Sequence, residues 1–166
     1  GHHRDGAEMA EDILSRLRFS GKWINLVNTM VESHLRPGQM SNKGAMPTSR
    51  AIYRYYRDVG EAAIDTLYLN MADYLAARGP LLEKEEWINY CATIRHILKE
   101  RPSPGEEKSK PNLIDGHDIM KIFSLAPGPK IGALLELVKE AEGSSQIGSK
   151  DEAIQLVKSK LSSGGQ

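Results

Sequence analysis

Apolar residues recur along this chain at the three- and four-residue intervals of amphipathic α-helices. The first stripe holds Ala10, Ile13, Leu14 and Leu17 on one helix face. The second follows a candidate N-cap at Ser20, and we expect it to face inward. It holds Trp23, Ile24, Val27, Met30, Val31 and His34. No segment has a convincing strand pattern, so the periodicity predicts an all-α fold.

Capping residues and helix breakers divide the sequence that follows. Thr48 is a candidate N-cap for a helix that runs to about Val59. An apolar helix is expected over residues 61–77, before the break at Gly79-Pro80. A further apolar stripe predicts a helix over residues 83–99. That stripe holds Trp87, Cys91, Ile94 and Leu98.

The stretch RPSPGEEKSKP, residues 101–111, has the proline, charge and small side chains of an exposed linker. We therefore expect one helical domain over residues 1–100 and another over residues 112–162. Three short helices are predicted in the second domain, over residues 116–124 behind Asp115, 128–142 and 149–161. The last of them opens with an S-x-x-E capping box from Ser149 to Glu152.

Composition and charge exclude some classes of function. The 22 Lys and Arg residues balance the 22 Asp and Glu residues, so any nucleic-acid binding has to come from a local patch. The single cysteine excludes an intrachain disulfide. Neither a membrane-spanning run nor a signal-peptide pattern is present. We therefore expect a cytoplasmic protein with no membrane partner.

Residues 33–57 form the one charge imbalance, with five basic side chains and no acidic one. Arg50, Arg54 and Arg57 are spaced i, i+4 and i+7, and so line one face of the helix expected after Thr48. Such a row could bind RNA phosphates, although at least two of the interleaved tyrosines are expected in the core. The alternative is a solvated face neutralised by nearby acidic residues or by another helix. The five basic residues are Arg36, Lys43, Arg50, Arg54 and Arg57.

A Pro-Gly-Pro turn, residues 127–129, leads directly into a predicted helix. Free backbone N–H groups at a helix start attract anions, and Lys130 adds positive charge beside them. Gly128 allows a close backbone approach, and Gly132 leaves room for a close neighbour. This pattern predicts a phosphate site. The alternative is a tight turn between helices with Gly132 at a packing contact.

Two polar residues, His34 and Asp73, stand among apolar helical residues. Burial of the Asp73 carboxylate would cost several kcal/mol without a partner, so we expect it to have one. Each residue can be interpreted as a polar core residue whose side chain is hydrogen-bonded. The alternative is that they contribute to a metal site or pair with an ionisable partner.

Three segments in the first part of the chain match a family pattern. They are GHHRDGAEMAEDILSRLRFS, VESHLRPGQM and PTSRAIYRYYRDVGEAAIDTLYLNMADYLA. Together they resemble the HD-type domain of bacterial tRNA nucleotidyltransferases and poly(A) polymerases. This resemblance implies that His2, His34 and Asp73 match the metal ligands of HD phosphohydrolases. The family's first histidine and its His-Asp doublet would precede residue 1, so we expect an incomplete site for a divalent metal.

The later part resembles the RNA-binding region of the same family. It carries Asp115-Gly116-His117-Asp118 and then the run APGPKIG, residues 126–132, in the family's order. The resemblance implies RNA contacts at Gly128, Lys130 and Gly132, whereas we expect Asp118 to stabilise a helix start. The expected architecture is a helical bundle from a partial HD-like domain, followed by a three-helix RNA-binding tail.

The implied function is to hold tRNA or another RNA while an upstream catalytic domain adds nucleotides from ATP or CTP with Mg²⁺. We assign no catalytic residue and no cofactor to this chain alone, because it lacks phosphate-loop, dinucleotide-binding and nucleophile-elbow motifs. Two alternatives remain open. One is a fragment of an HD-superfamily metal-dependent phosphohydrolase. The other is a noncatalytic helical protein-interaction module, and exposed apolar surface would also favour a homodimer.

Overall fold

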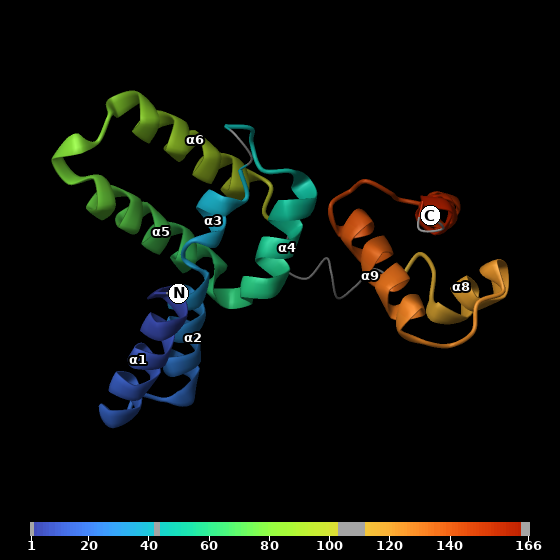
Figure 1. Cartoon of the computed structure of the whole chain (residues 1–166), viewed down its shortest axis with the longest axis horizontal. Helices are drawn as coiled ribbons and strands as arrows, with labels where there is room; N and C mark the ends of the chain where they lie inside the picture. Colours follow the sequence, from blue (N-terminus) through green and yellow to red (C-terminus); the bar gives the residue numbers. More distant parts are fainter. Residues whose placement is uncertain (1, 42–43, 103–111, 164–166) are drawn as a thin grey trace. The chain divides into compact units, whose positions relative to one another are not determined.

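The computed structural model describes residues 2–41, 44–102 and 112–163 (Figure 1). The chain divides into two compact units, residues 1–101 and 102–166. All regular secondary structure in the described ranges is helical, which confirms the expected all-α fold. None of the described helices is both long and apolar enough to cross a membrane. Lys43 and most of the expected linker, residues 101–111, lie outside the described residues.

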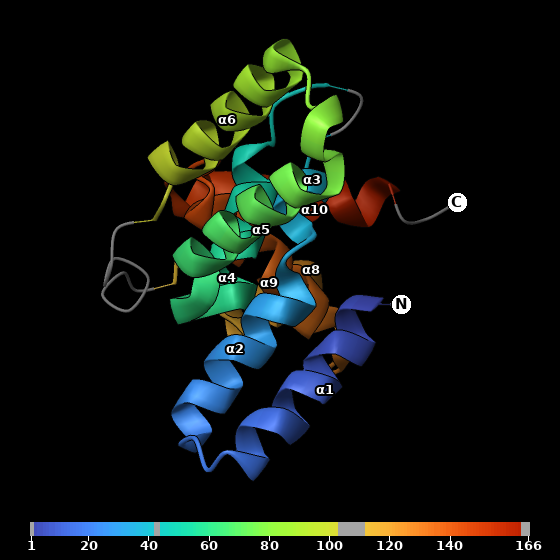
Figure 2. The ribbon, with the colours of Figure 1, turned by 90° about the vertical axis from the view of Figure 1, so that its left-hand side faces the viewer.

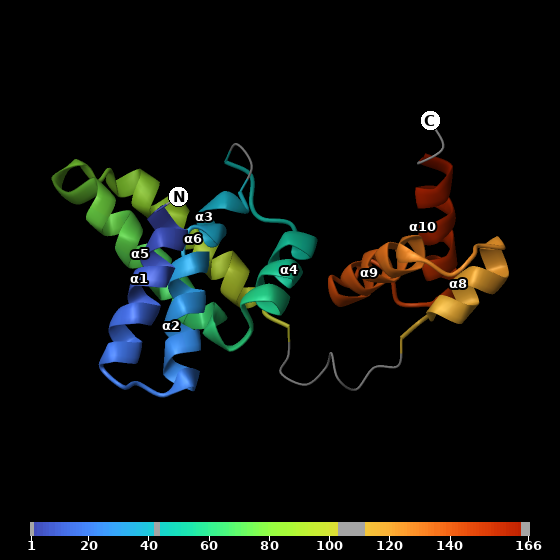
Figure 3. The ribbon, with the colours of Figure 1, turned by 60° about the horizontal axis from the view of Figure 1, so that its bottom comes forward.

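The first unit begins with a helical hairpin, in which α1 and α2 lie side by side (Figures 1 and 3). A second pair, α5 and α6, is joined through the short η2 turn (Figure 2). This pair is in contact through the stacked rings of Tyr74 and Tyr90, whose centroids are 3.9 Å apart. The elements of this unit are α1 His2–Arg16, α2 Gly21–Ser33, α3 Arg36–Gln39, α4 Ser49–Val59, η1 Gly60–Ala62, α5 Ala63–Arg78, η2 Gly79–Leu81 and α6 Lys84–Lys99.

The core of the first unit forms where α4, α5 and α6 meet. Ile52 and Tyr55 of α4, Leu67 of α5 and Ile97 of α6 are almost completely buried. The Tyr55 hydroxyl donates a hydrogen bond of 2.6 Å to the carbonyl oxygen of Ala63, and burial raises the pKa of this phenol. Because α4 is held by this inward face, its charged residues Arg54, Arg57 and Asp58 are exposed, whereas Arg50 is partly buried.

The α1–α2 hairpin leaves a group of large apolar side chains in solvent, which we call the hairpin patch. The expectation that Trp23 faces inward is wrong, because this side chain is 57% exposed. Periodicity identifies residues that share a helix face, but it does not show whether that face is covered. No described residue covers the face of α2 that carries Trp23. The hairpin patch consists of Met9, Ile13, Leu17, Phe19 and Trp23, which are 63%, 43%, 60%, 49% and 57% exposed.

The described residues of the second unit form three helices around their own small core. Ile119 of α8, Val138 of α9 and Val157 of α10 are buried at its centre. Helix α9 contacts both of the other helices. The three helices are α8 Gly116–Phe123, α9 Pro129–Gly143 and α10 Lys150–Ser163.

Local capping explains where several helices begin. The Thr48 side chain accepts the N–H of Ala51 at 3.2 Å, as expected at the start of α4. At the start of α10, the N–H of Glu152 donates to the Ser149 hydroxyl and the Glu152 carboxylate accepts the N–H of Ser149. Both predictions are confirmed. Ser20 occupies the N-cap position of α2, but its side chain makes no capping hydrogen bond.

Candidate nucleic-acid interface

The Asp-Gly-His-Asp motif builds the start of α8. The N–H of Asp118 donates to the Asp115 carboxylate at 2.8 Å, and the N–H of Asp115 donates to the Asp118 carboxylate at 3.3 Å. Lys150 of α10 also donates to Asp118 at 2.9 Å, and together with the bond from Asp115 it holds the pKa of Asp118 below its ordinary value. The expectation that Asp118 stabilises a helix start is confirmed.

Gly116 brings this motif against the first turn of α9. A Cβ atom at Gly116 would lie 3.3 Å from Cγ2 of Ile131 and 3.6 Å from Cδ1 of Leu135. The first contact is tighter than side chains normally make, so the absence of a side chain allows the two helices to approach. The two motifs that carry the family resemblance in this unit therefore pack directly against each other.

The start of α9 presents glycine and lysine residues to solvent. Gly128 is the N-cap residue, Pro129 is the first helical residue, and Gly128, Lys130 and Gly132 are all exposed. A Cβ atom at Gly128 or at Gly132 would meet no atom within 4 Å other than its chain neighbours and the local helix backbone. The described chain thus provides no close packing neighbour for Gly132. The space around this helix start is open to a ligand.

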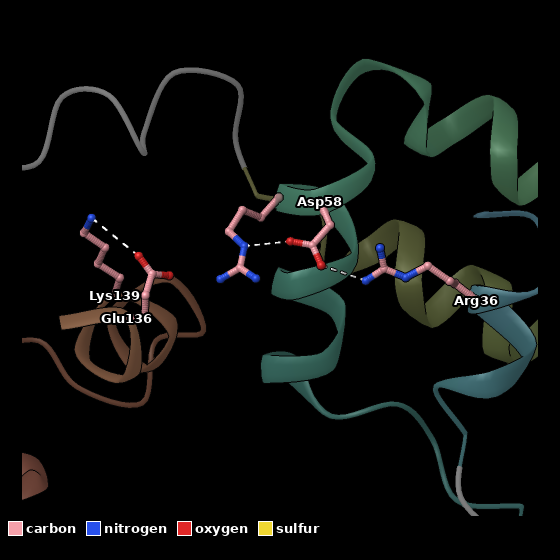
Figure 4. Close-up of polar contacts among 5 residues, drawn as sticks. Arg36, Asp58, Glu136 and Lys139 are labelled. Atoms are coloured by element: carbon pink, nitrogen blue, oxygen red, sulfur yellow. Dashed lines mark hydrogen bonds and ion pairs between the residues drawn. The ribbon is translucent and has the colours of Figure 1, made fainter. Parts of the chain in front are cut away.

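The arginine row lies on α4, and one of its members, Arg57, is already paired with an acidic residue of the chain. Arg57 donates to one carboxylate oxygen of Asp58 at 2.8 Å, and Arg36 donates to the other at 2.9 Å (Figure 4). Desolvation opposes ionisation of Asp58, but the two guanidinium groups outweigh it and lower its pKa. Arg50 and Arg54 also have intrachain interactions. This favours partial neutralisation of the row, while Tyr53 and Tyr55 are buried as expected.

The structure brings together two of the three expected metal ligands. The ring centroids of His2 and His34 are 5.8 Å apart. His34 is buried and makes a hydrogen bond with the Val31 carbonyl oxygen. Asp73 is exposed on α5, so the expectation that it is a buried carboxylate requiring a partner is wrong. Across the described ranges, no three His, Cys, Asp or Glu side chains are grouped to hold a metal ion.

The sequence is similar to parts of two curated enzymes. It is 29% identical over 156 residues to the A-adding tRNA nucleotidyltransferase of Deinococcus radiodurans, a match that covers 92% of this chain and 33% of the relative. It is 30% identical over 157 residues to the CC-adding tRNA nucleotidyltransferase of Thermus thermophilus, covering 92% of this chain and 32% of the relative. This chain belongs to the tRNA nucleotidyltransferase family. No family model and no solved structure matches it.

This member of the tRNA nucleotidyltransferase family spans about a third of the length of the curated relatives it matches. Because 92% of the chain is covered, the similarity takes in both helical units. The resemblance to the tRNA nucleotidyltransferase family is therefore confirmed.

The sequence of this tRNA nucleotidyltransferase relative did not identify one basic residue that lies beside the start of α9. Lys160 near the end of α10 and Lys130 near the start of α9 line the same small cavity. Thirty residues separate the two lysines, and no motif links them. Only the packing of α10 on α9 brings them to one site, so no signal in the linear pattern could have identified the pair.

Proposed function

We propose that this chain binds tRNA and positions it while a catalytic domain of the same parent enzyme adds nucleotides to the RNA. The observation that carries the proposal is the packing of the start of α8 onto the start of α9. This packing leaves Gly128, Lys130 and Gly132 exposed in open space. The names of the two relatives, which act on tRNA, support the choice of ligand.

The start of α9 has three properties that favour an RNA phosphate. The backbone N–H groups of Gly128 and Lys130 lie at the positive end of the helix dipole, whereas Pro129 has no N–H and Ile131 donates its N–H to the Gly128 carbonyl oxygen at 3.0 Å. The Lys130 ammonium adds a full positive charge at the second helical position. The two glycines remove side chains that would hold a sugar-phosphate backbone away from these groups.

The arginine row of α4 is proposed as a secondary RNA contact. Arg54 and Arg57 are exposed, so their guanidinium groups are accessible to a phosphate. Arg57 shares its charge with Asp58, and Arg50 is only half exposed. We therefore expect the row to contribute less to tRNA affinity than the start of α9 does.

Nucleotide addition itself is assigned to the remainder of the parent enzyme. There, bound Mg²⁺ would supply electrostatic stabilisation for transfer of the nucleotidyl group of ATP or CTP to the RNA end. The residues of this chain are proposed to bind and orient the RNA, and none is given a role in the chemical step. Substitutions here should therefore act on RNA affinity and placement.

The proposal is tested by measuring the affinity of the full chain for a tRNA transcript. Lys130→Gln should weaken binding about three- to tenfold, because one phosphate contact is lost. Lys139→Gln is the matched control, since Lys139 is exposed on the same helix and forms an ion pair of 3.8 Å with Glu136 (Figure 4). Equal affinities for the two variants, or no binding by the wild-type chain, would overturn the proposal.

A second candidate function, protein contact, is favoured by the hairpin patch. Five large apolar side chains exposed on one hairpin are typical of an interaction surface. We propose that the catalytic domain of the parent enzyme covers this patch. In the isolated chain, two copies of the patch would then associate into a homodimer.

A further inference from the structure

A small cavity opens between α9 and α10, beside the proposed phosphate site. Its volume is about 210 Å³, and it has an aliphatic floor with a lysine on each of the two helices. Among the residues that the structure describes, no acidic side chain lines it. The lining residues are Lys130, Ala133, Leu134, Leu137, Lys160 and Leu161.

We propose that this cavity receives one unpaired nucleotide of the bound RNA. The base or ribose lies on the aliphatic floor, and the adjoining phosphate lies between Lys130 and Lys160. This inference rests on the proposed function, since it names the part of the RNA that the second unit recognises. It adds Lys160 and the cavity floor to the contact surface.

The size of the cavity favours a single nucleotide. Pockets for drug-sized ligands typically enclose roughly 300–1,000 Å³. A cavity of about 210 Å³ is smaller than this range, so it suits one planar base or one sugar. A docked partner helix would need a longer groove for a row of side chains.

The charge of the cavity selects an anionic partner. Two ammonium groups stand beside an aliphatic floor, and the described lining includes no carboxylate that would neutralise them. A nucleotide combines an uncharged face with a phosphate, and so complements both parts of this surface. Lys130 belongs to both the cavity and the start of α9, which places the two contacts on successive stretches of one RNA backbone.

Because the floor is aliphatic, it offers no hydrogen-bonding groups that would select one base over another. The cavity should therefore accept any unpaired nucleotide. Leu137 and Leu161 offer van der Waals contact to any base or ribose that has left a helical stack. A base inside a duplex cannot enter without being unpaired. Recognition should therefore distinguish unpaired from paired RNA.

Three variants separate the charge and the shape of the cavity. Lys160→Gln removes one ammonium group, and Ala133→Leu fills the cavity from an exposed position without changing the charge. Lys158→Gln is the matched control, because Lys158 is exposed on α10 and does not line the cavity. Circular dichroism melts of each variant show whether α9 and α10 still pack.

The affinities of these variants are measured for a tRNA transcript, a single-stranded decanucleotide and a duplex of the same length. We expect Lys160→Gln and Ala133→Leu to weaken single-strand and tRNA binding about three- to tenfold, with duplex binding unchanged within twofold. Lys160→Gln should also reduce the salt slope by about 0.7 for the single strand, whereas Ala133→Leu should leave that slope unchanged. Lys158→Gln should bind like the wild type.

The outcomes distinguish this inference from the proposed function. If both cavity variants bind every RNA like the wild type while Lys130→Gln remains impaired, the cavity proposal is overturned and the proposed function stands. If the cavity variants instead disrupt only self-association, the cavity is a protein-docking site and the inference is wrong. A wild-type chain without RNA affinity overturns both proposals.

Discussion

Gly116 faces Ile131 so closely that a Cβ atom on the glycine would lie 3.3 Å from Cγ2 of the isoleucine. This contact joins the start of α8 to the start of α9. A larger residue directly after Asp115, the N-cap of α8, would crowd the Ile131 side chain, and a glycine avoids this. Next to this contact, the single glycine of the Pro-Gly-Pro turn, Gly128, is exposed, and a Cβ atom on it would meet nothing within 4 Å apart from its chain neighbours.

The two glycines of these motifs should therefore respond differently to substitution. Gly116→Val should destabilise the second unit by about 1–3 kcal/mol, because the added atoms overpack the α8–α9 contact. Gly132→Ala should stabilise it by about 0.5–1 kcal/mol, because the position is helical and open.

Urea unfolding followed by circular dichroism measures both effects. Both Trp and all six Tyr residues lie in the first unit, so fluorescence follows that unit and the remaining dichroism change isolates the second. A destabilised Gly132→Ala chain would show that this glycine is needed for internal packing, contrary to our account.

Acid should weaken the second unit through Asp118 and Glu152. The pKa of Asp118 is lowered by hydrogen bonds from Lys150 and Asp115, and that of Glu152 by hydrogen bonds from Gly148 and Ser149. A carboxylate with a lowered folded pKa stabilises the fold above its unfolded pKa, and this contribution is lost as pH falls through the folded value. With unfolded values of 3.8 and 4.5, the contribution is fully present only above about pH 5.

The pH dependence can be assigned with one variant. Asp118→Asn should lower the free energy of unfolding at pH 7 and reduce its decline between about pH 5 and pH 2. The same dichroism and fluorescence comparison at each pH provides the measurement. A decline as steep in Asp118→Asn as in the wild type would assign the acid sensitivity to other groups.

Metal binding by the first unit should be weak. His2 and His34 provide two neighbouring rings, and the described residues supply no third ligand to them. After equilibrium dialysis against Zn²⁺ or Mn²⁺, we expect much less than one retained ion per chain by elemental analysis. One retained equivalent that is lost in His2→Ala, a change at an exposed residue, would contradict this expectation.

The hairpin patch should make the isolated chain self-associate. Ile13→Glu places a charge within this patch on α1, away from the buried cores. Light scattering coupled to size exclusion should show a dimer that grows with wild-type concentration and is lost in the variant. A monomeric wild type at high concentration would argue against this surface as a protein contact.

Local sequence signals predicted much of the fold because the structures they specify are local. Thr48, Asp115 and Ser149 satisfy backbone N–H groups within three residues, so their spacing alone is informative. The 3.6-residue period likewise predicted where the helices lie, because helix formation depends on residues close together in the sequence. It could not show which face would be covered, and so Trp23 and Asp73 were wrongly expected to be buried.

The candidate site was predictable only in part. Gly128, Lys130 and Gly132 lie within five consecutive residues, and the family resemblance identified them as candidate RNA contacts. The ion pair from Arg36 to Asp58 joins residues 22 apart, and the Lys130–Lys160 cavity depends on how α10 packs on α9. These relationships arise from tertiary packing, which periodicity and spacing do not encode.

On the proposed function, the start of α9 binds RNA phosphates in the space beside Gly128 and Gly132. The most direct test is the salt dependence of tRNA affinity for the wild-type chain and for Gly132→Ala. We predict that wild-type affinity falls steeply with salt, by about 0.7–0.9 logarithmic units per phosphate contact for each tenfold rise. Gly132→Ala should be more stable and yet bind tRNA more weakly. A wild-type affinity at low salt no better than that of an unrelated neutral protein would contradict the account.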